Sequence, residues 1–236
     1  MRTMSRYEFK YGLNQRQYRS LFAALQSRMV LDSFSRQRGY YWVRSLYFDT
    51  ADYVAYWEKV HGDSHRCKLR FRSYGLEPAA APYVSLELKT KIGDRTDKFS
   101  SFVDTPPAGN LRHYFRALQS STDPVVKEFL RRVYVQHLQP KVLVQYRRQG
   151  FVTRDPSPLR VTLDHQVESA AAATLFPPRT RFRGHGPAVV LEVKTDIDPP
   201  HWLQGLVVQC GLPVQKNSKY AQAVENAAWD VIRPPS

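Results

Sequence analysis

Residues 67–75 constrain the fold most, because charged and apolar side chains alternate there before the stretch ends at Gly75. Lys68, Arg70 and Arg72 occupy every second position, with apolar residues between them. A β-strand directs successive side chains to opposite faces of its sheet, so the three cations share one face. At a spacing of about 7 Å and an effective dielectric near 20, neighbouring cations repel by roughly 2 kcal/mol. Either water screens this face or a polyanion neutralises it.

Three further segments alternate in the same way and carry carboxylates beside their cations. They contain Arg6, Glu8 and Lys10; Glu87 and Lys89; and Glu192 and Lys194. For one strand, the ordinary interpretation is a solvated face of an antiparallel sheet. Four such strands favour a barrel whose outside is packed by helices and whose charged faces line the interior.

The charge balance of the chain favours anionic partners. The 236 residues carry a formal net charge of +14, from 35 Lys and Arg against 21 Asp and Glu. Nucleic acid, acidic membrane, nucleotides and polyphosphate all fit this excess. A nucleic-acid binder would place its cations on an exposed patch or recognition helix, whereas here they alternate with core residues on strands. We therefore expect no nucleic-acid partner.

Length, cysteine content and hydropathy indicate a soluble cytoplasmic protein. A chain of 236 residues suits one large β-rich domain or two small ones. Cys67 and Cys210 are the only cysteines, which is too few for a disulfide framework. The first residues lack the apolar segment of a signal peptide, and no stretch approaches the ~20 apolar residues that span a bilayer.

Hydrophobic periodicity and capping residues predict the remaining elements. Helices are expected over residues 14–27, 51–60, from 124 onward, 200–210 and 216–231, with Asn14, Asp49 and Asp123 as caps. Further strands are expected over residues 40–48, 83–91, 95–103, 140–149, 159–166 and 189–194. Lys216 and Lys219 would lie on one side of the last helix, because residues three apart share a helix face. Residues 170–174 and 177–186 are expected to form a mobile loop.

Several familiar catalytic motifs are absent from the sequence. It contains no Walker-type phosphate loop, no Rossmann glycine motif and no HExxH pattern, and two separated cysteines exclude a multi-cysteine zinc site. Phosphoryl transfer remains, since it requires mainly cations, a divalent metal and alignment of donor with acceptor. Glu8 and Glu87 could serve as counter-ions or as ligands of Mg²⁺ or Mn²⁺, and Glu192 is the expected metal ligand.

Eight short motifs occur in one order along nearly the whole chain. They are RYEFKY (residues 6–11), SLYFDT (45–50), KLRFRSYG (68–75), ELK (87–89), YRR (146–148), LRVTLD (159–164), EVK (192–194) and SKY (218–220). In these motifs the chain resembles the VTC-type polyphosphate polymerase domain, a branch of the triphosphate tunnel metalloenzymes related to CYTH phosphatases and cyclases.

The resemblance implies a fold, a reaction and a set of site residues. The fold would be α+β: a single tunnel domain over residues 1–236, built as an eight-stranded antiparallel β-barrel with helices packed on the outside. Its enzyme would move the γ-phosphate of ATP or another nucleoside triphosphate onto polyphosphate, with Mn²⁺ or Mg²⁺. The implied catalytic cations are Lys10, Arg70, Arg72, Lys89, Lys216 and Lys219. The implied phosphate ligands are Lys59, Lys98, Arg148, Arg160 and Lys194, and the implied metal carboxylates are Glu192, Glu87 and Glu8.

One departure from the CYTH relatives bears on the reaction. Their first strand carries Glu-x-Glu-x-Lys, whereas Arg6 here replaces the first glutamate. Fewer carboxylates activate water less well, which favours transfer or binding over hydrolysis. A triphosphate hydrolase that positions water with Glu8 or Glu87 remains an alternative, as does a non-catalytic module that binds polyphosphate or nucleotide. A membrane-associated partner is compatible with the resemblance, because family members are often fused to membrane segments.

Overall fold

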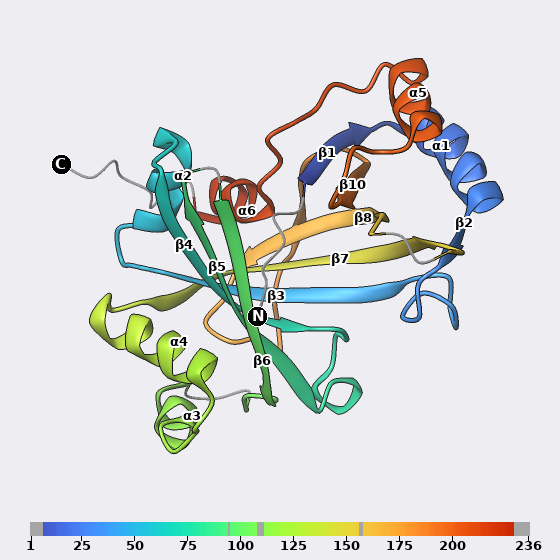
Figure 1. Cartoon of the computed structure of the whole chain (residues 1–236). Coiled ribbons are helices and arrows are strands. Elements are labelled where there is room, and N and C mark those ends of the chain that lie inside the picture. The colour runs from blue at the N-terminus through green and yellow to red at the C-terminus, as the bar shows by residue number, and fades with distance from the viewer. Residues whose placement is uncertain (1–6, 94, 108–110, 156–157, 229–236) are drawn as a thin grey trace. The chain divides into compact units, whose positions relative to one another are not determined.

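The computed structural model describes residues 7–93, 95–107, 111–155 and 158–228 (Figure 1). The chain divides into two compact units. The first unit comprises residues 1–42, 146–167 and 184–218, and the second comprises residues 43–145, 168–183 and 219–236. Arg6, which replaces the first glutamate of the CYTH pattern, lies outside the described residues.

Within the described residues, the chain forms six α-helices and ten strands. The helices are α1 (Gln15–Arg28), α2 (Val54–His61), α3 (Leu111–Leu118), α4 (Pro124–Val135), α5 (His201–Gln209) and α6 (Lys219–Ala228), with a 3-10 turn at Pro78–Ala80. The strands are β1 (Tyr7–Leu13), β2 (Met29–Leu31), β3 (Tyr41–Asp49), β4 (His65–Ser73), β5 (Tyr83–Ile92), β6 (Arg95–Asp104), β7 (Gln139–Thr153), β8 (Arg160–Ala171), β9 (Arg183–Gly184) and β10 (Val189–Thr195).

The strands pair into one large antiparallel sheet. Its order is β1-β10-β8-β7-β3-β4-β5-β6, with β2 paired to β7 and β9 paired to β8. The expected α+β class with an antiparallel sheet is confirmed. In the part of the chain that the structure describes, the end strands β1 and β6 share no ladder, so closure into the expected barrel is not observed.

In the first unit, α1 and α5 cover the apolar face of β1, β10 and β8 (Figure 1). Asn14 caps α1 in a capping box, because its side chain accepts from the Gln17 amide and the Gln17 side chain accepts from the Asn14 amide. Leu21 and Leu25 of α1 are fully buried in the core of this unit. With this face covered, the alternating polar positions of the same strands lie on the opposite face.

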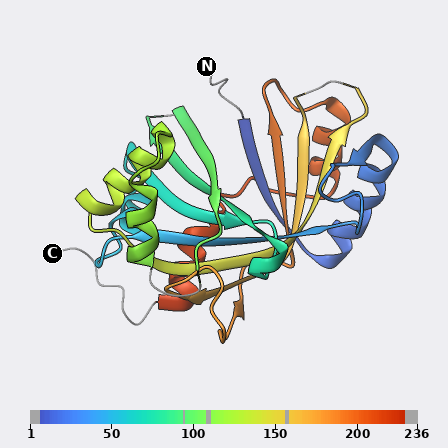
Figure 2. The same ribbon diagram turned by 90° about the horizontal axis from the view of Figure 1, so that it is seen from below.

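In the second unit, α3 and α4 pack together against one face of strands β4 and β5 (Figure 2). Asp123 caps α4 by accepting from the Val125 and Val126 amides, and Pro124 occupies the first turn. Phe129 of α4 stacks on Phe71 of β4 with ring centroids 5.4 Å apart. Burial of these aromatic side chains fixes which face of β4 is apolar, and therefore which face carries its cations.

The last helix differs from the expectation. It begins at Lys219, so Lys216 lies before the helix and the expected pairing of the two lysines on one helix face is wrong. The amide of Gln215 donates to the carbonyl of Lys10 (2.8 Å), which holds this segment beside β1. The expected end of the helix, residues 229–231, lies outside the described residues.

Two smaller differences concern α2 and the loop. α2 begins at Val54, because Tyr53 before it adopts a left-handed conformation (φ 58°). In the expected mobile loop, residues 183–184 form β9. Leu175 and Phe176, between its two segments, are buried against the core of the second unit. Cys67 and Cys210 are both free thiols.

None of the described helices has the length and hydropathy needed to cross a membrane.

Candidate functional site

A row of lysines crosses three neighbouring strands of the second unit. Lys68 on β4 pairs in register with Lys89 on β5, and Lys89 pairs with Lys98 on β6. Directly opposite residues in an antiparallel pair hold their Cβ atoms about 4.5–5.5 Å apart, where like charges are destabilising. Arg70 and Arg72 continue the same face along β4. We name these five residues the basic face, and its charge suits a polyanion.

Glu87 is the carboxylate paired with Arg70 across β4 and β5. Its oxygens accept from Arg70 Nε (2.7 Å) and from Lys98 Nζ (2.8 Å), and only 1% of the residue is exposed. Burial alone would raise the pKa of Glu87, but Arg70, Arg72 and Lys98 hold it well below its usual range. The geometry therefore favours the counter-ion interpretation of Glu87 over the metal-ligand one.

Tyr47 contacts Arg70, and the charge of Lys219 acts on the same tyrosine. Arg70 Nη1 donates to the Tyr47 hydroxyl at 2.8 Å. Burial would raise the pKa of Tyr47, yet the charges of Arg70, Arg72 and Lys219 lower it. The positive charge of Lys219, at the start of α6, therefore acts on the Tyr47 hydroxyl together with the charges of the two arginines. Lys59 lies on α2 of this unit and is half-buried.

The first unit carries a mixed-charge face on β1, β10 and β8. Glu8 pairs in register with Lys194, and Lys10 pairs with Glu192. Lys10 Nζ lies 3.3 Å from Glu8 Oε1 and 3.9 Å from Glu192 Oε1. Lys194 Nζ lies 3.8 Å from Glu8 Oε1 and 3.6 Å from Glu192 Oε2. The two carboxylates thus share the same two lysines. Burial lowers the pKa of Lys194 to about 8, although Glu192 and Glu8 raise it.

Arg148 is buried next to this face. Its guanidinium donates to both oxygens of Asp164 (2.6 and 2.8 Å) and to Glu192 Oε2 (3.2 Å). Burial would lower the pKa of Arg148, but Asp164 and Glu192 raise it well above the ordinary value. Arg148 therefore remains charged and orients Glu192 through a charge-assisted hydrogen bond.

Arg160 and Lys216 are the other cations expected in the first unit, and Arg160 pairs in register with Lys194 across β8 and β10. Arg160 donates to Asp32 Oδ2 (2.8 Å) and to the Tyr41 hydroxyl (3.3 Å). Lys216 is exposed on the segment before α6. Lys10 also donates to the backbone oxygen of Asn217 (3.1 Å), which holds the next residues of that segment against β1.

Glu8 and Glu192 are the residues that could hold a divalent metal. The described part of the chain contains no cluster of three or more His, Cys, Asp or Glu side chains suited to a metal. Mg²⁺ in phosphate-transferring sites is usually bound by one or two carboxylates together with substrate phosphates. Two buried oxygens without a hydrogen-bond partner, Thr162 Oγ1 and Asn217 Oδ1, belong to this unit. Thr162 pairs in register with Glu192, so the donor set fits an oxygen-preferring metal that is completed by substrate.

Several residues with defined contacts were missed by the sequence reasoning. The sequence pattern could have indicated Tyr47, because it alternates with Ser45 on the strand that precedes the strand of Lys68, Arg70 and Arg72. Its contact with Arg70 could not be predicted, because it depends on how these two strands pair. Arg72 Nε donates to Ser45 at 3.2 Å. No sequence pattern indicated Asp32, because it follows a strand of only three residues, which is too short to show a recognisable alternation.

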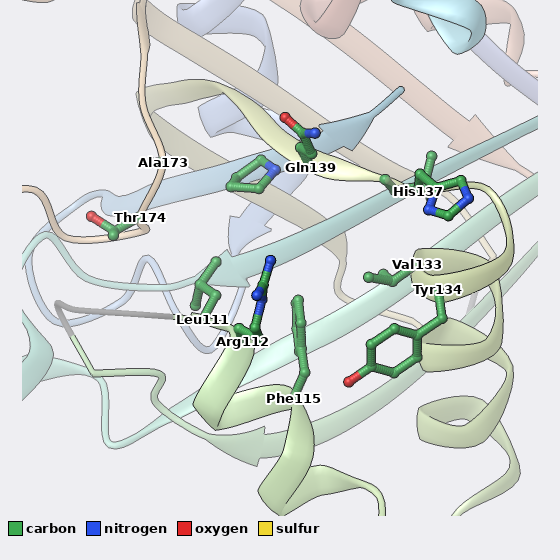
Figure 3. A pocket seen from close by; sticks show the side chains of 11 residues that line it. Leu111, Arg112, Phe115, Val133, Tyr134, His137, Gln139, Ala173 and Thr174 are labelled. Carbon is green, nitrogen blue, oxygen red and sulfur yellow. The ribbon is translucent and has the colours of Figure 1, made fainter. Parts of the chain in front are cut away.

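The described residues line two cavities, one in each unit. A cavity of about 450 Å³ in the second unit is lined by residues of α3, the end of α4 and the segments that follow, including Arg112, Phe115, Tyr134 and His137 (Figure 3). A cavity of about 420 Å³ in the first unit lies beside α5 and is lined mostly by apolar residues. Neither contains a residue of the basic face.

Comparisons with known proteins place this arrangement in a family. A search of curated proteins finds no match. A solved structure titled "putative adenylate cyclase", from Bacillus halodurans, is similar at 13% sequence identity and a TM-score of 0.49, over 91% of this chain and 96% of that one. The family model described as the VTC domain matches residues 5–228. This chain therefore belongs to the VTC domain family.

Proposed function

We propose that this VTC domain is a metal-dependent polyphosphate polymerase. It would transfer the γ-phosphate of ATP, or of another nucleoside triphosphate, to the end of a polyphosphate chain. The observation that carries the proposal is the basic face, where Lys68, Lys89 and Lys98 stand in one cross-strand row beside Arg70 and Arg72. Closure of the sheet into a tunnel, formed by one domain over residues 1–236, is part of the proposal.

The basic face suits the charge changes of phosphoryl transfer. A terminal oxygen of polyphosphate attacks the γ-phosphorus, the bond from that phosphorus to the bridging oxygen breaks, and the nucleoside diphosphate leaves with the electron pair. Arg70, Arg72 and Lys89 would stabilise the negative charge on the transferred group and the leaving oxygen. The acceptor requires no general base, because a terminal phosphate is largely ionised at neutral pH.

The first unit would supply further phosphate ligands and the metal ligands. Lys10, Arg148, Arg160 and Lys194 are the cations proposed to hold phosphate there, and Lys59, Lys98, Lys216 and Lys219 complete the proposed set. Glu192 and Glu8 would hold Mn²⁺ or Mg²⁺. The bound metal would neutralise phosphate charge and help to align donor with acceptor. Displacement of Lys10 and Lys194 from the carboxylates would free both ammonium groups for phosphate.

The carboxylates support transfer rather than hydrolysis. A hydrolase needs a base that activates water, and catalysis is best when the pKa of that base lies near the working pH. The pKa of Glu87 is held far below that range by Arg70, Arg72 and Lys98. Glu8 is already engaged by Lys10, whose Nζ lies 3.3 Å from Glu8 Oε1. ATP and polyphosphate as partners, together with two free cysteines, suit the cytoplasm.

Product analysis with γ-labelled ATP and Mn²⁺ tests the proposal. We expect label in chains that lengthen with time, with one nucleoside diphosphate formed per phosphate added. Label released only as free phosphate would favour the hydrolase instead. Tight tripolyphosphate binding without any turnover would favour a non-catalytic binding module.

A further inference from the structure

A buried carboxylate joins α2 to α6 near the basic face. Asp49, at the end of β3, has no exposed surface. Its Oδ1 accepts from the amides of Thr50 (2.8 Å) and Ala55 (2.9 Å), and its Oδ2 accepts from the amide of Tyr56 (3.1 Å). Oδ2 also accepts from the hydroxyl of Tyr220 on α6. The bonds from Ala55 and Tyr56 hold the first turn of α2, whereas the bond from Tyr220 holds a different helix.

Tyr220 lies between this carboxylate and the cations. Its ring centroid is 5.1 Å from that of Tyr47, whose hydroxyl accepts from Arg70. The ammonium of Lys68 lies over the Tyr220 ring, 5.2 Å from its centroid. Lys219, the residue before Tyr220, is 9% exposed. The side chain of Tyr220 is therefore the contact through which Asp49 fixes the start of α6.

We propose that Asp49 and Tyr220 are positioning residues that hold Lys219 toward the phosphates bound by the basic face. This inference rests on the proposed function for the identity of the ligand. Neighbouring helix residues are about 100° apart around the axis, so a rotation of α6 moves the Lys219 ammonium by several ångströms. Apolar packing restricts such a rotation only loosely, whereas the hydrogen bond from Tyr220 to Asp49 restricts it directionally.

The titration of Tyr220 is consistent with this role. Burial, followed by the charge of Asp49, raises the pKa of Tyr220 well above its ordinary value. The hydroxyl therefore keeps its proton throughout the physiological range and always acts as the donor. A second bond, from the Tyr56 hydroxyl to Glu225 Oε1 (3.3 Å), also links α2 to α6.

A double-mutant cycle on tripolyphosphate binding tests the proposal. Tyr220→Phe removes only the hydroxyl, and we expect about a tenfold loss of affinity by calorimetry without metal, as for a lost hydrogen bond to a charged group. In a Lys219→Ala background, Tyr220→Phe should cause no further loss, because it acts through Lys219. Equal losses in both backgrounds would overturn the positioning role and leave only a contribution to stability.

A second variant and a matched control complete the test. Asp49→Asn keeps Oδ1 for the Thr50 and Ala55 amides but replaces Oδ2, which accepts from both the Tyr56 amide and the Tyr220 hydroxyl. We therefore expect at least the same tenfold loss, with no greater loss when it is combined with Tyr220→Phe. Tyr114→Phe is the control, because it removes a tyrosine hydroxyl bonded to the Asp104 carbonyl on the helical side of the unit. Loss of affinity in this control equal to that in Tyr220→Phe would overturn the proposal. Absence of tripolyphosphate binding by the wild type would overturn the proposed function as well, whereas wild-type binding with an additive cycle would overturn only the positioning role.

Discussion

Lys68 and Lys89 lie directly opposite each other in the antiparallel register of β4 and β5. The register continues from Lys89 to Lys98 on β6, so three ammonium groups cross the sheet in one row. Like charges at such short range repel each other, and Glu87 offsets part of this repulsion through its ion pair with Lys98. The charge of this row is the physical basis for proposing a polyanionic ligand, rather than an uncharged one, at the basic face.

Reversal of one charge in the row should weaken anion binding strongly. We expect Lys89→Glu to lower tripolyphosphate affinity about 100-fold at low salt, because it removes one attraction and adds one repulsion, with a smaller effect at high salt. Lys127→Glu is the control, since it makes the same change in net charge on the exposed surface of α4. Similar losses in the two variants, measured by calorimetry at two salt concentrations, would show that only the overall charge matters.

Acid should destabilise the protein in part through Glu87. The unfolded carboxyl titrates near 4.5, whereas the folded pKa is held lower by Arg70, Arg72 and Lys98, against the effect of burial. The stability that Glu87 contributes is therefore fully present above pH 4.5 and is lost as the pH falls below it. The loss is at most about 1.4 kcal/mol per pH unit. Urea unfolding at pH 6, 4 and 3 should give a shallower acid dependence for Glu87→Gln. An unchanged dependence would mean that Glu87 is not held ionised by its cations.

Removal of Arg148 should destabilise the first unit. Arg148→Ala leaves Asp164 and Glu192 buried without their guanidinium, and breaking a buried ion pair in this way typically costs about 3–5 kcal/mol. Chemical denaturation at neutral pH measures the loss. Arg131→Ala, which removes a partner of Glu128 on the surface of α4, should unfold close to the wild type. Comparable unfolding midpoints for the two variants would contradict the assigned role of Arg148.

Metal binding should depend on Glu192. In the presence of tripolyphosphate, we expect Glu192→Gln to weaken Mn²⁺ binding about tenfold or more, because a neutral amide replaces a charged oxygen ligand. Electron paramagnetic resonance of free Mn²⁺ reports this directly. Glu128→Gln is the matched control on α4, and Mn²⁺ affinity that is equal in the two variants would place the metal elsewhere.

The sequence predicted the chemistry of each strand better than the relationships between strands. Alternation placed Lys68, Arg70 and Arg72 on one face correctly, because a strand repeats every two residues whatever it packs against. The lysine row and the bond from Arg70 to Tyr47 depend on register, which is set by pairing between distant segments. No local pattern contains that information.

Lys216 illustrates why local periodicity also fails. The pattern predicted a helix from residue 216, but the bonds from the Gln215 amide to Lys10 and from Lys10 to Asn217 hold this segment beside β1. The helix therefore begins only at Lys219. The same dependence on tertiary contacts hid Asp32, whose partner Arg160 lies 128 residues further along the chain.

The central claim is best tested by following γ-labelled ATP through a single turnover with Mn²⁺ and a short polyphosphate primer. We expect the label to enter lengthened chains. Arg70→Ala should slow this transfer about 10²–10³-fold, as for loss of a group that stabilises charge in the transition state. Lys127→Ala should transfer at the wild-type rate. Chain growth by Arg70→Ala within twofold of the wild type, or label released solely as free phosphate, would contradict the account.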